Sequence, residues 1–380
     1  LKLGVGNKET LGSNEERLLS SLKEFHDKFY SANLMKLILV GNQSSKELEK
    51  LARKYFSNIK NKKVARPVTE ISAYREQDLS KEIFIRSKIK SPIFLIEFPI
   101  KDNRSQWKSK PNQYIAKLIN SQEDGSLMTM LQDKGLIQSG QATLMPSAWG
   151  KDGSAFVEYS LTEKGEKNKE LILYSTHQFI DLIKSNGIDQ AYFDELASIN
   201  SIQFEDYQSP SALSLAVQFG QKIFDWPSEN LIDFAYVTSE FNANAIKDVL
   251  DQMTPERSRI YHIGPNEVSD IDLKYADGAF RVKSLIAKKL TATAYSNIAL
   301  RLPQPEIIEN ETDAQMVQSD EFQRPVRIYQ DIGVQAYLSN SQDHPGKEGI
   351  LNLGIISSVP SESVNNLVSS WILNTAFLKA

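Results

Sequence analysis

The chain has 380 residues, with 44 Lys and Arg against 48 Asp and Glu, and a formal net charge of −4. This balance excludes a general basic field that would hold nucleic acid or an anionic membrane surface. With 41% hydrophobic and 24% charged residues, the composition is typical of a globular protein and excludes wholesale disorder. The absence of cysteine excludes disulfide scaffolds, iron–sulfur clusters, thiolate zinc sites and cysteine nucleophiles.

Neither targeting nor membrane signals stand out. No run approaches the ~18 apolar residues of a membrane helix, and the longest, residues 93–100, is interrupted by Glu97 and Pro99. No apolar segment typical of a signal peptide begins the chain. Because the sequence starts at Leu1 rather than Met and closes with the apolar residues 371–380, we expect both ends to be cuts through a longer protein.

The first elements in chain order are two helices around a short strand. Apolar residues recur at intervals of three and four over residues 15–30, which predicts a helix. Residues 34–40 (LMKLILV) form a short apolar run before a glycine, which is typical of a strand. Ser44 stands three residues before Glu47, the pattern of a capping box, so a second helix is predicted through Phe56.

The middle of the chain mixes strands and helices after a basic segment at 61–73, which is predicted to be a linker or a strand leaving one domain. Strands are predicted at 81–88, 92–100, 137–145, 155–161 and 259–263. Helices are predicted at 112–120, 126–134, 162–184, 189–199, 210–224, 228–236 and 243–253. Residues 267–312 read as irregular apart from a helical piece near 284–300. Beyond them, we expect strands at 326–329, 332–338 and 349–356 and a helix at 361–377.

Two comparisons within the chain suggest a repeated module. A helix, a short break and a strand lead to Gly-Asn at Asn42, and the same order leads to Gly-Pro-Asn at Asn266. A strand, a hairpin, a longer strand, a polar loop and a helix start at Ile83 and again at Ile328. The pattern predicts the tail of one module, a complete module of ~230 residues and the head of a third.

The most specific string is FHDKFYSANLM at residues 25–35. Together with GNKETL at 6–11, LQDKGL at 131–136, SLTEKG at 160–165 and YFDEL at 192–196, it resembles the pitrilysin / insulin-degrading enzyme (insulinase) family of zinc metallopeptidases. The resemblance spans nearly the whole chain in order. It implies a protein of four homologous α+β modules, each a mostly antiparallel sheet covered by helices, forming two halves that close around a peptide.

The resemblance also implies a domain order. Residues 1–72 would be the C-terminal part of the first, catalytic-type module. Residues 73–302 would be the complete second, non-catalytic module, 303–325 a linker between halves, and 326–380 the start of the third module. The zinc motif of this family, H-x-x-E-H, lies in the first module.

The zinc motif is absent from this sequence. The histidines are His26, His177, His262 and His344, and no two lie within one helical turn, so neither H-x-x-E-H nor H-E-x-x-H occurs. Each has a structural or solvated interpretation. We therefore expect no metal and no catalytic residue in this chain, no peptide hydrolysis by it alone, and zinc in the parent protein bound upstream of Leu1.

Other polar clusters have structural interpretations. Asp194 and Glu195 would point in different directions from a helix, which makes a poor acid–base pair. The Gly-containing segments 4–6 and 150–153 lack the surroundings of phosphate loops and are predicted turns. The basic run at 60–66 has no interleaved aromatic residues and reads as a solvated linker.

One region has a positive case. In insulinase-like enzymes the second module carries an exosite, built from a Gly-containing loop and an exposed strand edge, which holds the N-terminal end of the substrate. By position the loop matches Glu123, Asp124 and Gly125, and the strand matches Ser139, Gly140, Gln141, Ala142, Thr143 and Leu144.

The physical logic is that of an edge strand. Its free N–H and C=O groups can take an extended peptide as an added strand. We expect Gly140 and Ala142 to leave room for the incoming backbone, and Glu123 or Asp124 to attract its amino terminus. The family's glycine pair is replaced here by Ala142 and Thr143, and an ordinary hairpin strand at the sheet edge is the structural alternative.

Three functions follow as hypotheses. The first is a fragment of a pitrilysin-like zinc metalloendopeptidase that supplies chamber wall and peptide anchoring, with peptides or small proteins and the remaining modules of the same chain as partners. The second is part of a catalytically inactive homologue that acts as a peptide-binding or assembly subunit. The third is a scaffold without a ligand. We expect no nucleic acid partner, and a periplasmic or cytoplasmic location with the periplasm favoured.

Overall fold

The computed structural model describes residues 11–12, 14–67, 71–146, 151–205, 207, 210–273, 278–285, 299–305, 326–331 and 334–338. The chain divides into two units, Leu1–Glu309 and Asn310–Ala380, each considered by itself. Their division falls inside the predicted linker 303–325, while the assignment of modules stays a prediction.

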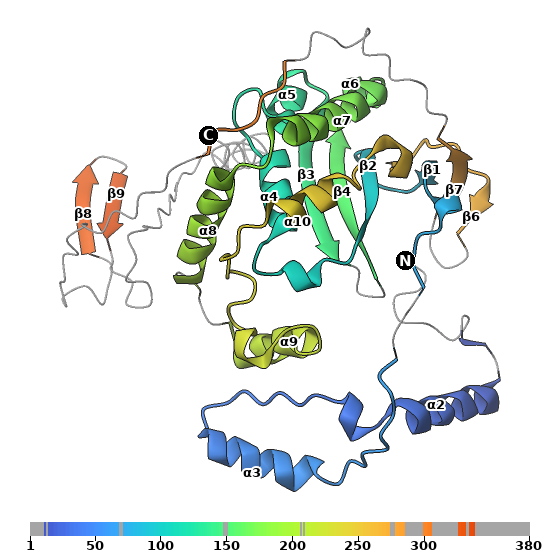
Figure 1. Ribbon diagram of the computed structural model, residues 1–380, viewed down its shortest axis with the longest axis vertical. Coiled ribbons are helices and arrows are strands. Elements are labelled where there is room, and N and C mark those ends of the chain that lie inside the picture. The colour runs from blue at the N-terminus through green and yellow to red at the C-terminus, as the bar shows by residue number, and fades with distance from the viewer. Residues whose placement is uncertain are drawn as a thin grey trace. The chain divides into compact units, whose positions relative to one another are not determined.

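A seven-stranded sheet forms the centre of the first unit (Figure 1). Its spatial order is β3-β4-β2-β5-β1-β7-β6. The strands are β1 (Lys81–Arg86), β2 (Ile93–Lys101), β3 (Ile137–Pro146), β4 (Asp152–Leu161), β5 (Arg259–Gly264), β6 (Ile271–Asp272) and β7 (Ala279–Ser284). Only the β1–β5 pair is parallel among the described neighbours. The predicted α+β class with a mostly antiparallel sheet is therefore confirmed.

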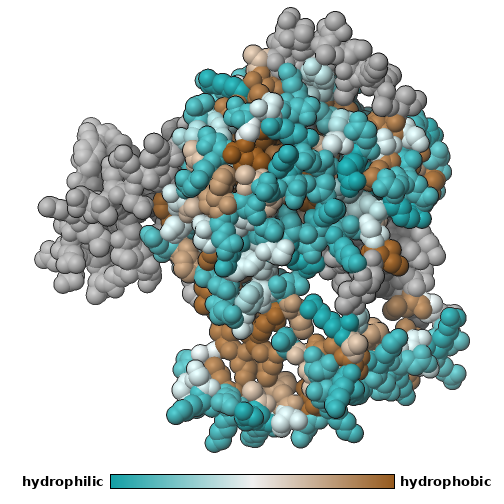
Figure 2. Space-filling model, in the orientation of Figure 1, coloured by the Kyte–Doolittle hydropathy of each residue, from teal (hydrophilic) through white to brown (hydrophobic). Residues whose placement is uncertain are grey.

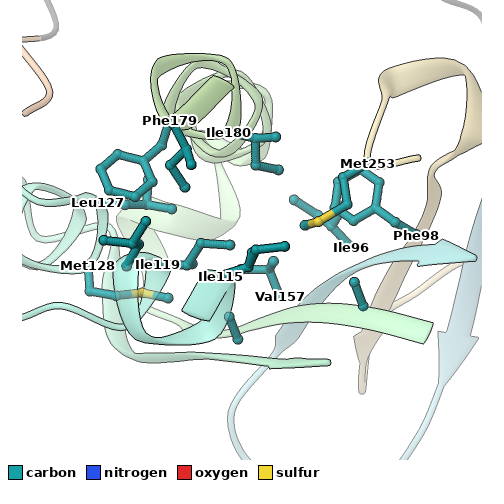
Figure 3. Close-up of a cluster of buried hydrophobic side chains, with 14 of the residues drawn as sticks. Ile96, Phe98, Ile115, Ile119, Leu127, Met128, Val157, Phe179, Ile180 and Met253 are labelled. Atoms are coloured by element: carbon teal, nitrogen blue, oxygen red, sulfur yellow. The ribbon is translucent and has the colours of Figure 1, made fainter. Parts of the chain in front are cut away.

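Helices cover one face of this sheet and create the core (Figure 1). They include α4 (Pro111–Ile119), α5 (Leu127–Asp133), α7 (Lys169–Asn186) and α10 (Ala243–Leu250). Strand residues alternate between the two faces, so Ile96 of β2 and Val157 of β4 point toward the helices. Figure 3 shows both in one buried cluster with Ile115 of α4 and Phe179 of α7, and all four side chains are fully buried. This layer fixes the position of β3, because α4 and α5 pack directly against it.

The predicted helix over 162–184 is two helices, α6 (Glu163–Glu166) and α7. Thr162 caps α6 by accepting the Gly165 N–H through its hydroxyl at 3.0 Å. The side chain of Asn168 donates to the Lys164 carbonyl at 2.7 Å and takes an acceptor that a continuous helix would use. The helix breaks there for that reason.

The N-terminal helices were predicted correctly as α2 (Glu15–Phe29) and α3 (Ser45–Phe56), and the capping box of Ser44 and Glu47 is present. The strand predicted at 34–40 is wrong. Residues 32–34 form a short 3₁₀ turn, and no described strand lies beside residues 35–40, so they have no ladder to join.

Apolar side chains are correspondingly exposed in this part of the chain. On α2, the exposed fractions of Leu19, Leu22 and Phe25 are 53%, 57% and 55%. Leu37 and Leu39 are also exposed. Figure 2 shows this apolar surface over the segment that holds α2 and α3.

Two further predictions need correction. Helices α8 (Gln190–Glu205) and α9 (Ala212–Lys222) form as expected, but residues 228–236 hold only a 3₁₀ turn (Ser228–Asn230) followed by turns. Here the Lys110 side chain donates a hydrogen bond to the carbonyl of Phe234. Strands β6 and β7 were missed, since their short, polar segments acquire strand structure only by pairing with β1 and each other.

The second unit holds an antiparallel pair, β8 (Val326–Asp331) and β9 (Val334–Leu338), at two predicted strands. The strand predicted at 349–356 and the helix at 361–377 lie outside the described residues, as does most of the helical piece near 284–300. Across the described part of the chain, no helix is both long and apolar enough to span a membrane.

Candidate functional site

Strand β3 carries six of the nine residues predicted to bind a peptide, Ser139 to Leu144. It lies at one end of the sheet order and pairs with β4 alone. The register places Gly140 opposite Tyr159, Ala142 opposite Val157 and Leu144 opposite Ala155. The prediction that this segment is an edge strand of the described sheet is confirmed.

The centre of this edge is occupied by the chain's own Asn120. Its Oδ1 accepts the Ala142 N–H at 2.6 Å, and its Nδ2 donates to the Ala142 carbonyl at 2.9 Å. Both backbone groups of Ala142 therefore point away from β4. Because this direction alternates along an antiparallel strand, the groups of Gly140 and Leu144 also point outward, while the residues between them pair with β4.

The small side chains at the edge have a different role from the one expected. A Cβ atom at Gly140 would lie 2.6 Å from Sδ of Met128 and 2.9 Å from a ring atom of Tyr159. Ala142 is only 3% exposed and belongs to the core. Both residues are small because α4 and α5 pack closely on β3, which corrects the expectation that they make room for an incoming backbone.

The predicted loop Glu123–Gly125 is held by residues from far along the chain. The Glu123 carboxylate accepts the Gln304 N–H at 2.9 Å. Arg301 donates its backbone N–H to the Gly125 carbonyl at 3.0 Å and its Nε to the Asp124 carbonyl. Glu123 and Asp124 are both exposed, but Glu123 is engaged through its carboxylate, whereas Asp124 is engaged through its backbone carbonyl.

The loop and the strand are brought together at one point. Asn120 stands between α4 and the loop, and its two bonds to Ala142 place the start of the loop against the middle of β3. The loop carbonyls and Glu123 face residues 301–304 instead. The two predicted parts of the site are thus neighbours joined through Asn120, a residue that sequence reasoning missed.

A cavity of about 200 Å³ lies at the C-terminal end of β3. Its walls include Leu144 and Pro146 of β3 together with Trp107, Lys110, Trp226 and Phe234, and we name it the Trp pocket. Trp226 stacks on Phe234 with ring centroids 4.8 Å apart, and Trp107 meets Trp226 edge-on at 6.1 Å. Sequence reasoning missed this pocket, because its walls come from three separate segments of the chain, at residues 103–113, 144–146 and 226–235.

Lys110 is one of two charged residues that line this pocket, the other being Arg104, which pairs with Asp102 and Asp225. The Lys110 side chain is nearly buried, with the whole residue 8% exposed, and its Nζ donates to the Phe234 carbonyl at 2.5 Å. Burial lowers the pKa of Lys110 to about 8, although the nearby Asp233 charge opposes the shift. The residue also has left-handed backbone angles, φ 46° and ψ 44°, at the start of α4. A non-glycine residue held in this region marks a strained position.

A buried carboxylate supports the other face of the sheet. Glu97 of β2, 3% exposed, accepts the Tyr74 and Tyr261 hydroxyls at 2.6 Å each and Arg259 at 2.9 Å. Burial, assisted by this carboxylate, raises the pKa of Tyr74 to about 12. The network ties residues 71–78 to the sheet. Its hydrogen bonds satisfy the charge, so it reads as structural.

The described residues do not fit a zinc site. They contain no cluster of three His, Asp or Glu side chains placed to hold a metal ion. His26 is exposed beside Asp27, His177 is buried edge-on to Phe98, and His262 stacks on Phe84. His344 lies outside the described residues.

The adjacent carboxylates of α8 point apart, as expected. Glu195 is buried and paired with Lys117 of α4 at 2.7 Å, whereas Asp194 is exposed. The pair therefore holds two helices together through one member, and its geometry does not suit acid–base chemistry.

Two family models match this chain. The model described as the peptidase M16 inactive domain matches residues 18–200, and that of the middle or third domain of peptidase M16 matches residues 203–379. The chain belongs to the M16 family of peptidases. This confirms the resemblance seen in the sequence, since pitrilysin and insulin-degrading enzyme are among the proteins it matches.

Relatives show how much of such a protein is present. Protease 3 of Escherichia coli K12 is 30% identical over 308 residues, which are 80% of this chain and 32% of that protein. The insulin-degrading enzyme of Drosophila melanogaster is 27% identical over 325 residues, 81% of this chain and 32% of that protein. The crystal structure of pitrilysin superposes with a TM-score of 0.78 at 27% identity, covering 89% of this chain and 36% of that one. The M16 chain described here thus spans about a third of these relatives.

Proposed function

We propose that this chain is part of a longer pitrilysin-like zinc metalloendopeptidase, in which it supplies wall of a closed chamber and anchors peptide substrates. The observation that carries the proposal is the edge of β3, where the N–H and C=O groups of Gly140 and Leu144 point outward from the sheet. Similarity to Protease 3 and insulin-degrading enzyme supports peptides as the ligand class.

Backbone pairing explains how one edge could hold peptides of many sequences. An added strand bonds through its own N–H and C=O groups, and each net hydrogen bond is worth about 0.5–1.5 kcal/mol. Asn120 competes for the central position, because a peptide residue that paired with Ala142 would have to replace both of its bonds. The exposed Asp124 of the loop is the proposed partner for a peptide amino group.

Cleavage chemistry is assigned to no residue of this chain. The sequence lacks H-x-x-E-H, and the described side chains form no zinc site. A relative in Schizosaccharomyces pombe carries a name that describes a zinc protease, which supports zinc in the whole protein. We propose that the metal is bound outside this chain. A catalytically inactive homologue acting as a peptide-binding subunit would use the same edge and differ in the missing zinc motif.

The remaining modules of the same protein are the proposed partners of the exposed apolar surface. Apolar patches on α2 and residues 35–40 are unusual for a surface that stays in water. Leu22 and Phe25 of α2 and Leu39 supply such surface. We propose that other segments of the longer chain pack on this face. The location in the periplasm or cytoplasm stays a prediction.

A peptide titration tests the proposal. The isotope-labelled chain is titrated with an unstructured, Ala- and Ser-rich peptide, and the amide signals of residues 139–144 are followed. We expect the signals of Gly140 and Leu144 to shift first. In Asn120→Ala, which frees both groups of Ala142, we expect binding several-fold tighter because two competing hydrogen bonds are gone.

The matched control is Gln138→Ala, at an exposed residue of β3 outside the predicted site. It should leave peptide affinity within a factor of two. If no amide of residues 139–144 shifts in either the parent chain or Asn120→Ala, the edge is a scaffold and the proposal is wrong. Metal analysis and a peptide cleavage assay on the same samples should show neither stoichiometric zinc nor hydrolysis.

A further inference from the structure

The alternation of side chains along β3 determines on which face of the sheet the side chains of an added strand would lie, and at Leu144 that face holds the Trp pocket. Residues directly opposite each other in an antiparallel pair point to the same face of the sheet. Ala142 is buried in the core on the helix side, and Leu144, two residues on, packs against the same core. A peptide residue opposite Leu144 would therefore project to the helix side, where Leu144 forms a wall of the pocket.

Asn120 divides the edge into unequal parts. It holds both backbone groups of Ala142, so pairing at the centre requires its displacement. Gly140 lies on one side of it, where an added Cβ would already collide with Met128 and Tyr159. The Leu144 end combines outward backbone groups with concave space beside them. This end is the part of the edge that can take both a peptide backbone and a large side chain.

The walls of the pocket decide the kind of side chain. Two indoles, a phenyl ring and two prolines supply flat apolar surface, and such surfaces favour aromatic partners in edge-to-face or offset arrangements. A cavity of about 200 Å³ is smaller than the sites that enclose whole ligands, which are roughly 300–1,000 Å³. Lys110 places a cation at the pocket, which attracts an aromatic ring face and repels a basic side chain.

We infer that the Trp pocket is a subsite for one aromatic side chain of a peptide paired with the Leu144 end of β3. The inference rests on the proposed peptide anchoring and adds a preference to a contact that is otherwise independent of sequence. Peptides with an aromatic residue opposite Leu144 are the favoured class, and peptides with Lys or Arg at that position are the disfavoured class.

The test uses the 380-residue chain and acetylated, amidated peptides of the form Ala-Ala-X-Ala-Ala, with X as Phe, Ala or Lys. Dissociation constants come from the amide shifts of residues 139–145. We expect the Phe peptide to bind about tenfold more tightly than the Ala peptide, as burial of an aromatic side chain would give, and the Lys peptide to bind no more tightly than Ala.

A variant that fills the pocket separates the subsite from the edge. Ala235 lines the pocket, so Ala235→Phe should remove the preference for Phe while the Ala peptide still shifts the Leu144 amide. Ala191→Phe, at an exposed position of α8, is the matched control and should keep the preference. Should Ala235→Phe fail to fold, Trp107→Ala removes an aromatic wall instead and should reduce the preference at least threefold.

Equal affinity of the Phe and Ala peptides for the parent chain would overturn the subsite and leave peptide anchoring intact. A preference for Phe that persists in folded Ala235→Phe would also overturn it, because the side chain would then bind elsewhere. Absence of amide shifts with every peptide would overturn the anchoring proposal and the subsite together.

Discussion

At the scale of single residues, Asn120 changes the interpretation of the candidate site. The unpaired edge of a sheet is a hazard, because it can pair with any extended chain. Here a side-chain amide imitates a neighbouring strand at one position, Ala142, and leaves the positions on both sides outward-facing. The edge is therefore neither fully open nor closed. For the proposed peptide, pairing at Ala142 would require replacing these two hydrogen bonds.

His177 provides a residue-scale prediction about pH. Burial lowers its pKa to about 4, well below the 6.5 of an exposed imidazole. The unfolded chain therefore binds a proton here below pH 6.5, while the folded chain stays neutral until about pH 4. Neutral His177 therefore makes its full contribution to the free energy of unfolding above pH 6.5. That contribution, about 2–3 kcal/mol, is lost as the pH falls from 6.5 toward 4.

The measurement is chemical denaturation between pH 4 and pH 7. In His177→Gln, the fall in stability over this window should be smaller than in the parent chain by about that amount. His26→Gln, at a side chain that is 62% exposed, serves as the control for the substitution itself. Parallel pH profiles for His177→Gln and the parent chain would show that His177 does not carry this linkage.

At the scale of elements, the sequence predicted what is decided locally. The Ser44–Glu47 capping box and strand β3 itself depend on patterns within a few residues, and both are present. The place of β3 at the sheet edge was expected from the family resemblance instead. The strand predicted at 34–40 was wrong because a strand needs a neighbouring strand to pair with. Strand β7 was missed because its strand structure comes from pairing with β1, which its own sequence pattern does not indicate. The Trp pocket and the contact of residues 301–304 with the loop at 123–125 could not be predicted, because each joins segments that are distant in the sequence.

Gly165 of α6 packs against the backbone of Leu136, the residue that precedes β3. A Cβ atom there would overlap the carbonyl oxygen of Leu136, which is backbone and has little freedom to move. We expect Gly165→Ala to lower the free energy of unfolding by about 2–4 kcal/mol, as overpacking against rigid atoms does. Denaturant titration measures the loss.

Gly220→Ala is the matched control. It also lies within a helix, α9, but an added Cβ would come no nearer than 4.0 Å to Ile38. Replacing a helical glycine by alanine in open space should stabilise by up to about 1 kcal/mol. Similar changes in both variants would mean that helix propensity, and not the contact with Leu136, sets the cost at Gly165.

At the scale of the whole molecule, residues 299–305 connect the candidate loop to the start of the predicted linker between halves. Arg301 bonds the carbonyls of Asp124 and Gly125, and the Pro303 carbonyl accepts the Tyr192 hydroxyl at 2.6 Å. Gln304 donates to Glu123. A loop proposed to lie near bound peptide is thus tied to the segment that leads out of the first unit, so a change at one is expected to reach the other.

Gly125→Ala tests this connection. Gly125 has φ +79°, and a Cβ atom there would lie 2.9 Å from Cγ of Arg301. Gly135 also has a positive φ, +65°, but nothing lies within 4 Å of its added Cβ, so Gly135→Ala carries the backbone strain alone. We expect both variants to lose about 1 kcal/mol of stability from strain. Only Gly125→Ala should expose Arg301, seen as faster hydrogen exchange of its amide and faster trypsin cleavage after it. Equal protection of the Arg301 amide in the two variants would show that residues 299–305 are held independently of the loop.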